Sequence, residues 1–207
     1  MNGKVRDLLN DQINKEMYSA YLYLDMANFY NDMGLDGFSN WYEVQAKEEM
    51  DHAMMIYHYL HDNNQKVTLE AVDKPDKVYE AAIDPLNAAY AHEQYVTELI
   101  NTIYAAAQEV NDFRTVQFLD WYVKEQGEEE KNASDLITKM ELFGSDPRGL
   151  YLLDQELAAE YIQKLHWLQC HCNINAKFQR DEGAIRPLAR HTMLSKTSCK
   201  RGFFIVL

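Results

Sequence analysis

The sequence predicts an all-α protein, a bundle of four long helices with one long crossover between the second and third helix, plus a short fifth helix. Three observations support this fold class. Only eight glycines and four prolines occur among 207 residues, about half of their usual share of roughly 12%. Apolar residues recur at spacings of three, four and seven along four long segments, as on one face of a helix. Pro75, Pro85 and Pro147 all lie outside the interiors of these helical segments.

The first two helices are expected to form a hairpin. One runs from about Lys4 to Met33, and Gly34 can end it in the left-handed conformation that glycine adopts at helix C-termini. The other runs from about Asp36 to Asn63. The faces expected to point inward carry Leu9, Ile13, Ala20, Tyr23, Leu24 and Ala27 in the first helix, and Phe38, Trp41, Gln45, His52, Ile56 and Tyr59 in the second.

The third and fourth helices are expected to form a second hairpin. The third is predicted to begin with Asp84 as its N-cap and Pro85 in its first turn, and to end near Val110. The fourth is predicted to begin at a second N-cap, Asp112, and to end near Leu142. Each pair is joined by only a few residues, so the helices of a pair must be antiparallel.

The connection between the hairpins decides the topology. Roughly 19 residues separate Asn64 from Asp84, with Pro75 in the middle. A helix of about 28 residues is ~42 Å long at 1.5 Å per residue, and an extended link of this size can span ~60 Å. The link can therefore return along the whole bundle, which distinguishes this topology from a simple up-down-up-down bundle.

The composition changes near the end of the chain. Gly144 is expected to end the fourth helix, and a shorter helix is predicted at about Leu150–Leu168. All three cysteines lie in the last 38 residues, where seven Lys or Arg stand against two Asp or Glu. We expect a helical domain at 1–160 and an atypical basic, Cys-containing extension at 161–207. The extension is interpreted either as a translated frameshift or vector-derived sequence, or as a functional appendage.

The net charge of −13 argues against a nucleic-acid partner and suits cationic partners, including metal ions. No stretch of about 18 uncharged apolar residues exists, so no membrane span is expected. The first residues lack the apolar core of a signal peptide. We therefore expect a cytoplasmic protein.

Each long helix is predicted to carry one carboxylate on its inward face. By the three-, four- and seven-residue spacing, the set is Glu16, Glu49 with His52, Glu93, and Glu129 with Gln126. No Lys or Arg lies on these faces, and burying an unpaired carboxylate costs several kcal/mol. Bound cations would supply the missing positive charge. Four carboxylates and one imidazole suit iron or manganese better than zinc, and two metals bridged by carboxylates would account for the number of ligands.

Five segments resemble the prokaryotic non-haem ferritins. They are Glu16 with Tyr23, EEMDHA at 48–53, HEQ at 92–94, WYVKEQGEEEK at 121–131 and GLYLLDQEL at 149–157. The likeness covers about residues 1–160 and implies a ferritin-like four-helix bundle. It also implies an iron storage protein with ferroxidase activity, which oxidises Fe(II) to Fe(III) with oxygen or hydrogen peroxide. Such proteins store ferric mineral inside a hollow homo-oligomeric cage, usually of 24 subunits.

The resemblance further implies a di-iron ferroxidase centre in each subunit. Site A would be held by Glu16, Glu49 and His52. Site B would be held by Glu49, Glu93 and Glu129, so that Glu49 bridges the two irons. Gln126 would lie near the dioxygen side, and Tyr23 would hydrogen-bond to a ligand or donate an electron. A third iron site, known in bacterial members, matches Glu48, Glu125, Glu128 and Glu129.

Other functions stay open. Met50 aligns with the haem-binding methionine of bacterioferritins, although the fourth helix has Gln126-x-x-Glu129 where those proteins have a second Glu-x-x-His. A non-catalytic iron-binding cage would lack an intact centre, whereas the ligand set here is complete. A di-iron enzyme acting on an organic substrate would need a substrate channel, for which the short loops leave little room.

Overall fold

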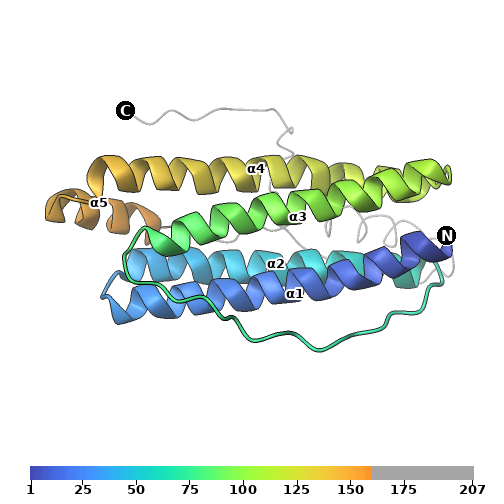
Figure 1. The fold of residues 1–207 in the computed structure, drawn as a ribbon, viewed down its shortest axis with the longest axis horizontal. Helices are drawn as coiled ribbons and strands as arrows, with labels where there is room; N and C mark the ends of the chain where they lie inside the picture. Colours follow the sequence, from blue (N-terminus) through green and yellow to red (C-terminus); the bar gives the residue numbers. More distant parts are fainter. Residues whose placement is uncertain (160–207) are drawn as a thin grey trace, which may run out of the picture. The chain divides into compact units, whose positions relative to one another are not determined.

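A computed structural model describes residues 1–159, which form five helices and, within this range, no β-strand (Figure 1). The all-α prediction is confirmed. The predicted extension at 161–207 lies outside the described residues. The helices are α1 (Gly3–Asp32), α2 (Asp36–Asp62), α3 (Asp84–Glu109), α4 (Phe113–Phe143) and α5 (Pro147–Leu157).

Two antiparallel hairpins make up the bundle. Helix α1 packs along α2, α3 packs along α4, and α1 also contacts α3. The turn between α1 and α2 contains Gly34 with φ of 74°, a left-handed conformation that glycine adopts without a steric penalty. In the turn between α3 and α4, Asn111 has φ of 55°, which asparagine tolerates better than most residues. Gly34 therefore ends the first helix as predicted.

The crossover at 63–83 runs parallel to α1 along the length of the bundle (Figure 1). Near the start of α1, Asn10 Nδ2 donates to the carbonyl oxygen of Lys66 at 3.3 Å. Near the end of α1, the Tyr30 hydroxyl donates to the carbonyl oxygen of Ala82 at 2.5 Å. Because these contacts advance along α1 as the crossover advances, α3 begins at the end of the bundle where α1 finishes.

The start of α3 differs in detail from the prediction. The N-cap is Ile83, and Asp84 is the first helical residue. The Asp84 carboxylate accepts the backbone N–H groups of Glu80 and Ala81, at 2.8 and 2.7 Å. Asp84 was therefore wrongly predicted as a cap, because its side chain closes the preceding turn instead. Pro85 lies in the first turn as expected.

The start of α4 follows the prediction. Asp112 is its N-cap, and the Asp112 carboxylate accepts the backbone N–H of Thr115 at 3.2 Å. One of the unpaired donors at the helix start is satisfied in this way.

Helix α5 begins at Pro147, three residues earlier than predicted, because Asp146 caps it through the backbone N–H of Gly149 at 2.9 Å. It ends at Leu157. We predicted that this helix continues to Leu168, which is wrong because residues 158 and 159 are no longer helical. Residues 160–168 lie outside the described residues.

Asp154 joins α5 to the start of α2. Its buried carboxylate accepts the backbone N–H groups of Gly37 and Phe38, at 2.8 and 3.1 Å. A Cβ added at Gly37 would lie 1.7 Å from the Asp154 carbonyl oxygen. Only glycine therefore permits this close approach, and the unpaired donors of the α2 N-terminus find their acceptor on another helix.

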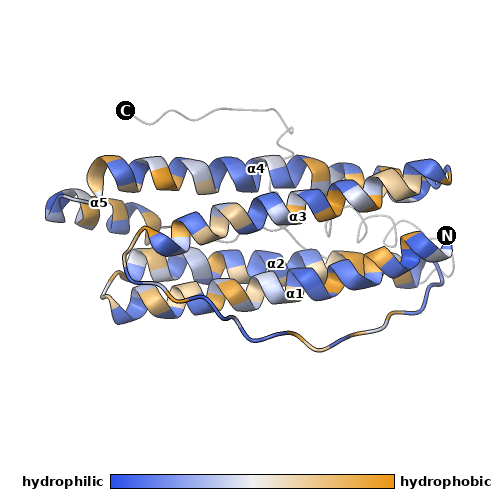
Figure 2. Cartoon of the chain, in the orientation of Figure 1, coloured by the Kyte–Doolittle hydropathy of each residue, from blue (hydrophilic) through white to orange (hydrophobic). Residues whose placement is uncertain are grey.

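The apolar faces of the helices are buried between them, and hydrophobic and hydrophilic residues alternate along each helix in Figure 2. Stacked aromatic rings occupy one end of the core, where Tyr30 lies 4.9 Å from Phe38 and 5.7 Å from Tyr42. Leu24 was predicted to point inward, which is wrong, since it is 49% exposed. It follows Tyr23 directly, and a step of one residue turns the side chain by about 100° on a helix.

No helix within residues 1–159 has an apolar stretch long enough to cross a membrane.

Candidate metal centre

The interior of the bundle contains a group of acidic side chains contributed by all four long helices. Its members are Glu16 from α1, Glu49 and His52 from α2, Glu93 from α3 and Glu129 from α4. Each is at most 7% exposed, and no Lys or Arg is buried among residues 1–159. These side chains therefore point inward, as the helical spacing predicted. As expected, no buried Lys or Arg of the described residues balances their charge.

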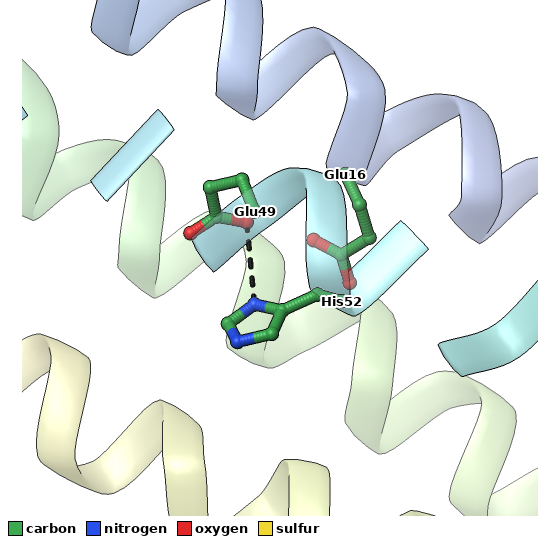
Figure 3. Close-up of side chains that lie close together, drawn as sticks. All are labelled: Glu16, Glu49 and His52. Atoms are coloured by element: carbon green, nitrogen blue, oxygen red, sulfur yellow. Dashed lines mark ion pairs between the residues drawn. The ribbon is translucent and has the colours of Figure 1, made fainter. Parts of the chain in front are cut away.

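Three of these side chains converge most closely (Figure 3). One ligand atom each from Glu16, Glu49 and His52 lies within 4.8 Å of the other two. Glu49 and His52 are three residues apart on α2, so they share a face, and Oε2 of Glu49 lies 3.5 Å from Nδ1 of His52. Glu16 approaches from α1, the antiparallel neighbour.

Two atoms of this group are buried without a hydrogen-bond partner. They are Oε2 of Glu16 and Nε2 of His52. Leaving such groups unpaired costs roughly 1–3 kcal/mol each, so their persistence in a dry interior calls for a ligand. A metal ion fits this donor set, because a carboxylate oxygen and an imidazole nitrogen both bind divalent iron.

Glu93 is held by two donors. The Tyr23 hydroxyl donates to its Oε1, and Nε2 of Gln126 donates to its Oε2 at 2.9 Å. These bonds link α1, α3 and α4 and orient the carboxylate inside the bundle. Glu93 and Glu129 lie outside the tight group of three ligand atoms.

Burial raises the pKa of Glu16, Glu49 and Glu129 well above the ordinary value of 4.5. Mutual repulsion adds to this effect, since Glu49 raises the pKa of Glu16, and Glu93 raises the pKa values of Glu49 and Glu129. Burial likewise raises the pKa of Glu93, although the hydrogen bonds from Tyr23 and Gln126 oppose the change. A bound cation would reverse these shifts by stabilising the charged carboxylates.

The residues of the predicted third site do not form a comparable group within residues 1–159. Glu48 and Glu125 are half-buried and Glu128 is exposed. Glu48 accepts a hydrogen bond from Gln45 at 2.5 Å, and Glu128 pairs with Lys124 at 2.6 Å. Two of these carboxylates, those of Glu48 and Glu128, therefore contact neighbours on their own helices.

Sequence reasoning missed side chains that support the centre. Gln12 is buried and donates from Nε2 to Oε1 of Glu16 at 2.9 Å. The Trp121 ring lies 5.3 Å from that of His52, edge to face. Tyr122 donates to the backbone oxygen of His52 at 2.7 Å. The position of Gln12, one helical turn before Glu16, is the one signal that could have revealed its role.

The family model of the ferritin-like domain matches residues 6–143, a range that includes every residue of the acidic group. The chain belongs to the ferritin family. This match confirms the ferritin-like bundle expected from the sequence motifs, and the structure itself shows the short fifth helix, α5.

Relatives within the ferritin family include the bacterial non-heme ferritin of Campylobacter jejuni, which is 39% identical over 155 residues. This match covers 75% of the present chain and 93% of the relative. The bacterial non-heme ferritin of Escherichia coli is 36% identical over 150 residues, or 72% of this chain and 91% of the relative. Among solved structures, an open pore ferritin of Archaeoglobus fulgidus is 42% identical with a TM-score of 0.76, over 78% of this chain and 98% of the other.

Proposed function

We propose that this chain is the subunit of an iron storage cage and that it oxidises Fe(II) at a buried centre within each subunit. One observation is the main support for this proposal. The side chains of Glu16, Glu49 and His52 converge on one point, and two of their atoms have no hydrogen-bond partner. Membership of the ferritin family and relatives named non-heme ferritins support it.

In this proposal the acidic group binds two iron ions as substrate. The first is held by Glu16, Glu49 and His52. The second is held by Glu49, Glu93 and Glu129, with Glu49 shared between the two. The raised pKa values of the carboxyls indicate that binding iron displaces protons from them.

The ligands favour oxidation, because anionic carboxylate oxygens stabilise Fe(III) more than Fe(II). Two ions held close together supply two electrons to one oxidant molecule. With two protons, those electrons reduce dioxygen to hydrogen peroxide, or hydrogen peroxide to two molecules of water. A one-electron reduction to superoxide is thereby avoided. The phenolic proton of Tyr23 meanwhile stays directed at Glu93 and keeps that carboxylate in position.

The more exposed carboxylates form a proposed route for the ferric product. Glu48 and Glu125 lie near the buried group, since both raise the pKa of Glu49, and Glu128 in turn raises the pKa of Glu125. A third iron bound by these residues and Glu129 would be held more weakly, because solvent screens exposed charges. Glu128 pairs with Lys124 through Oε1, which leaves Oε2 as the oxygen that would bind a metal there.

The oligomeric cage is part of the same proposal, with 24 copies of the chain enclosing the mineral in the cytoplasm. Exposed apolar side chains on α5, including Tyr151 and Leu152, are available to contact other copies. Native mass spectrometry of the full chain tests the copy number.

The haem-containing alternative rests on Met50, which is 42% exposed on α2. An absorbance spectrum of the purified protein without a haem band would exclude it.

Rapid mixing of the apoprotein with Fe(II) and oxygen or peroxide, followed by absorbance, tests the activity. Glu49→Ala should abolish the fast phase, because it removes the ligand shared by both irons. Glu43→Ala, at an exposed position on the same helix, is the matched control and should oxidise iron at the wild-type rate. Fast oxidation by a correctly assembled Glu49→Ala cage would overturn the proposed centre.

A further inference from the structure

His92 lies on α3 directly before Glu93, outside the group of proposed metal ligands. Its Nε2 atom lies 2.7 Å from the hydroxyl oxygen of Ser19 on α1. Ser19 is fully buried, and its hydroxyl donates to the backbone oxygen of Lys15 at 3.1 Å. Because a hydroxyl has only one hydrogen, Nε2 of His92 must be the donor in its bond to Ser19. The imidazole is thus anchored to α1 by a hydrogen bond of defined direction.

The ring of His92 also packs against the ring of Tyr23. The two ring centroids are 6.1 Å apart and the planes meet at 85°, an edge-to-face arrangement that aromatic pairs prefer. Tyr23 is 2% exposed and also contacts the ring of Tyr42 on α2, at 5.7 Å. The phenol is therefore enclosed by one ring from α3 and one from α2.

We propose that His92 is a positioning residue for the second iron. Anchored to Ser19, its ring holds the phenol of Tyr23 where the hydroxyl donates to Oε1 of Glu93. The inference rests on the proposed function, in which Glu93 binds the second iron. His92 acts there only through Tyr23 and touches neither the iron nor the carboxylates that bind it.

The spacing of the four residues explains how one pair controls the other. Ser19 and Tyr23 are four residues apart on α1 and so share a face, and His92 and Glu93 are neighbours on α3. The bond between Ser19 and His92 therefore fixes how far α1 is displaced along α3 at the point where Tyr23 must reach Glu93. A phenol that had to be ordered during metal binding would lower the affinity.

His92→Gln tests the proposal, because glutamine keeps an N–H donor for Ser19 but places no ring beside Tyr23. Tyr59→Phe is the matched control. It removes a 2.9 Å bond to Thr115, which is also a buried side-chain bond between two helices. Crystals of the metal-free full chain report the position of the Tyr23 hydroxyl, and calorimetric titration with Zn(II) reports the affinities of the first and second metal positions.

In His92→Gln we expect the Tyr23 hydroxyl to move away from Glu93. The affinity of the second metal position should fall several-fold while that of the first is unchanged. Tyr59→Phe should lower stability but leave both affinities as in the wild type. In a Tyr23→Phe background, His92→Gln should cause no further loss, because the hydroxyl that it positions is gone. Ser19→Ala, which removes only the anchor, is the second variant if His92→Gln does not fold, and it should act in the same direction.

A Tyr23 hydroxyl that stays on Glu93 in His92→Gln would overturn the proposal. So would an equal further loss of affinity in the Tyr23→Phe background, since His92 would then act by another route. A wild-type chain that binds only one Zn(II) would instead contradict the proposed two-iron centre. The metal-free crystals test the positioning of Tyr23 by His92 independently of that result.

Discussion

Gln12 donates a 2.9 Å hydrogen bond to Oε1 of Glu16, while Oε2 of the same carboxylate is buried without a partner. One oxygen is thus held by the protein and the other is left for a ligand. Because both residues lie on α1, one turn apart, the carboxylate is oriented before any metal arrives. Preorganisation of this kind reduces the cost of ordering a ligand when it binds.

Replacing Gln12 by leucine should weaken metal binding while leaving every proposed ligand in place. We expect the affinity of the first metal site to fall about tenfold, as is typical when a hydrogen-bond partner of a ligand is lost. Calorimetric titration with Zn(II) measures the change. Gln94→Leu, at an exposed position on α3, serves as the control. An affinity equal to that of the wild type would show that Glu16 needs no positioning by Gln12.

The raised pKa values of the buried carboxyls predict a specific dependence of stability on pH. Since burial raises the pKa values of Glu16, Glu49 and Glu129 above 4.5, the folded metal-free protein retains protons that the unfolded chain has lost. Their contribution is complete below pH 4.5 and is lost as pH rises through the folded pKa values.

Chemical denaturation of the metal-free protein across about pH 5 to 8 measures this loss. We expect the free energy of unfolding to fall more steeply with pH in the wild type than in Glu49→Gln, which has no carboxyl to ionise. Saturating Zn(II) should remove most of the difference by stabilising the ionised carboxylates. Parallel pH profiles for the two metal-free proteins would contradict the prediction.

Two helical glycines should respond oppositely to alanine. At Gly127 in α4, an added Cβ meets no atom within 4 Å, so Gly127→Ala should stabilise the protein by up to about 1 kcal/mol. At Gly37 in α2, the added Cβ would collide with the Asp154 carbonyl, so Gly37→Ala should destabilise it by about 1–3 kcal/mol.

Equilibrium unfolding in denaturant distinguishes these two effects. A destabilised Gly127→Ala variant would indicate that another copy of the chain approaches this open position. A neutral Gly37→Ala variant would mean that α5 shifts away from α2 at little cost.

Removing the Tyr23 hydroxyl should affect the second metal position more than the first. Tyr23→Phe leaves Oε1 of Glu93 without its donor, so we expect roughly tenfold weaker binding of the second metal ion and slower iron oxidation. Tyr21→Phe removes the same hydroxyl from an exposed side chain of the same helix and should have no effect. Equal loss at both metal positions would indicate a general disturbance of the core rather than a role at Glu93.

The sequence alone predicted the helices and the inward faces because both are local properties. The helical period of 3.6 residues places Glu16 among apolar neighbours, and Glu49 beside His52, whatever the rest of the chain does. The same rule misplaced Leu24, because Leu24 is spaced four residues from Ala20 and three from Ala27 and yet is exposed, one residue beyond the buried Tyr23. Asp84 was misassigned as a cap because its nearest unpaired N–H groups lie before it in the chain.

Contacts between distant residues were decided only by tertiary structure. Tyr23 and Glu93 are hydrogen-bonded although they are 70 residues apart in the sequence, and Gly37 and Asp154 are hydrogen-bonded although they are 117 residues apart. Such pairs depend on how far each helix is displaced along its neighbour, which is set by the packing of the entire core and not by any local pattern. The helical period therefore determined which side chains face inward, and packing decided which of them touch.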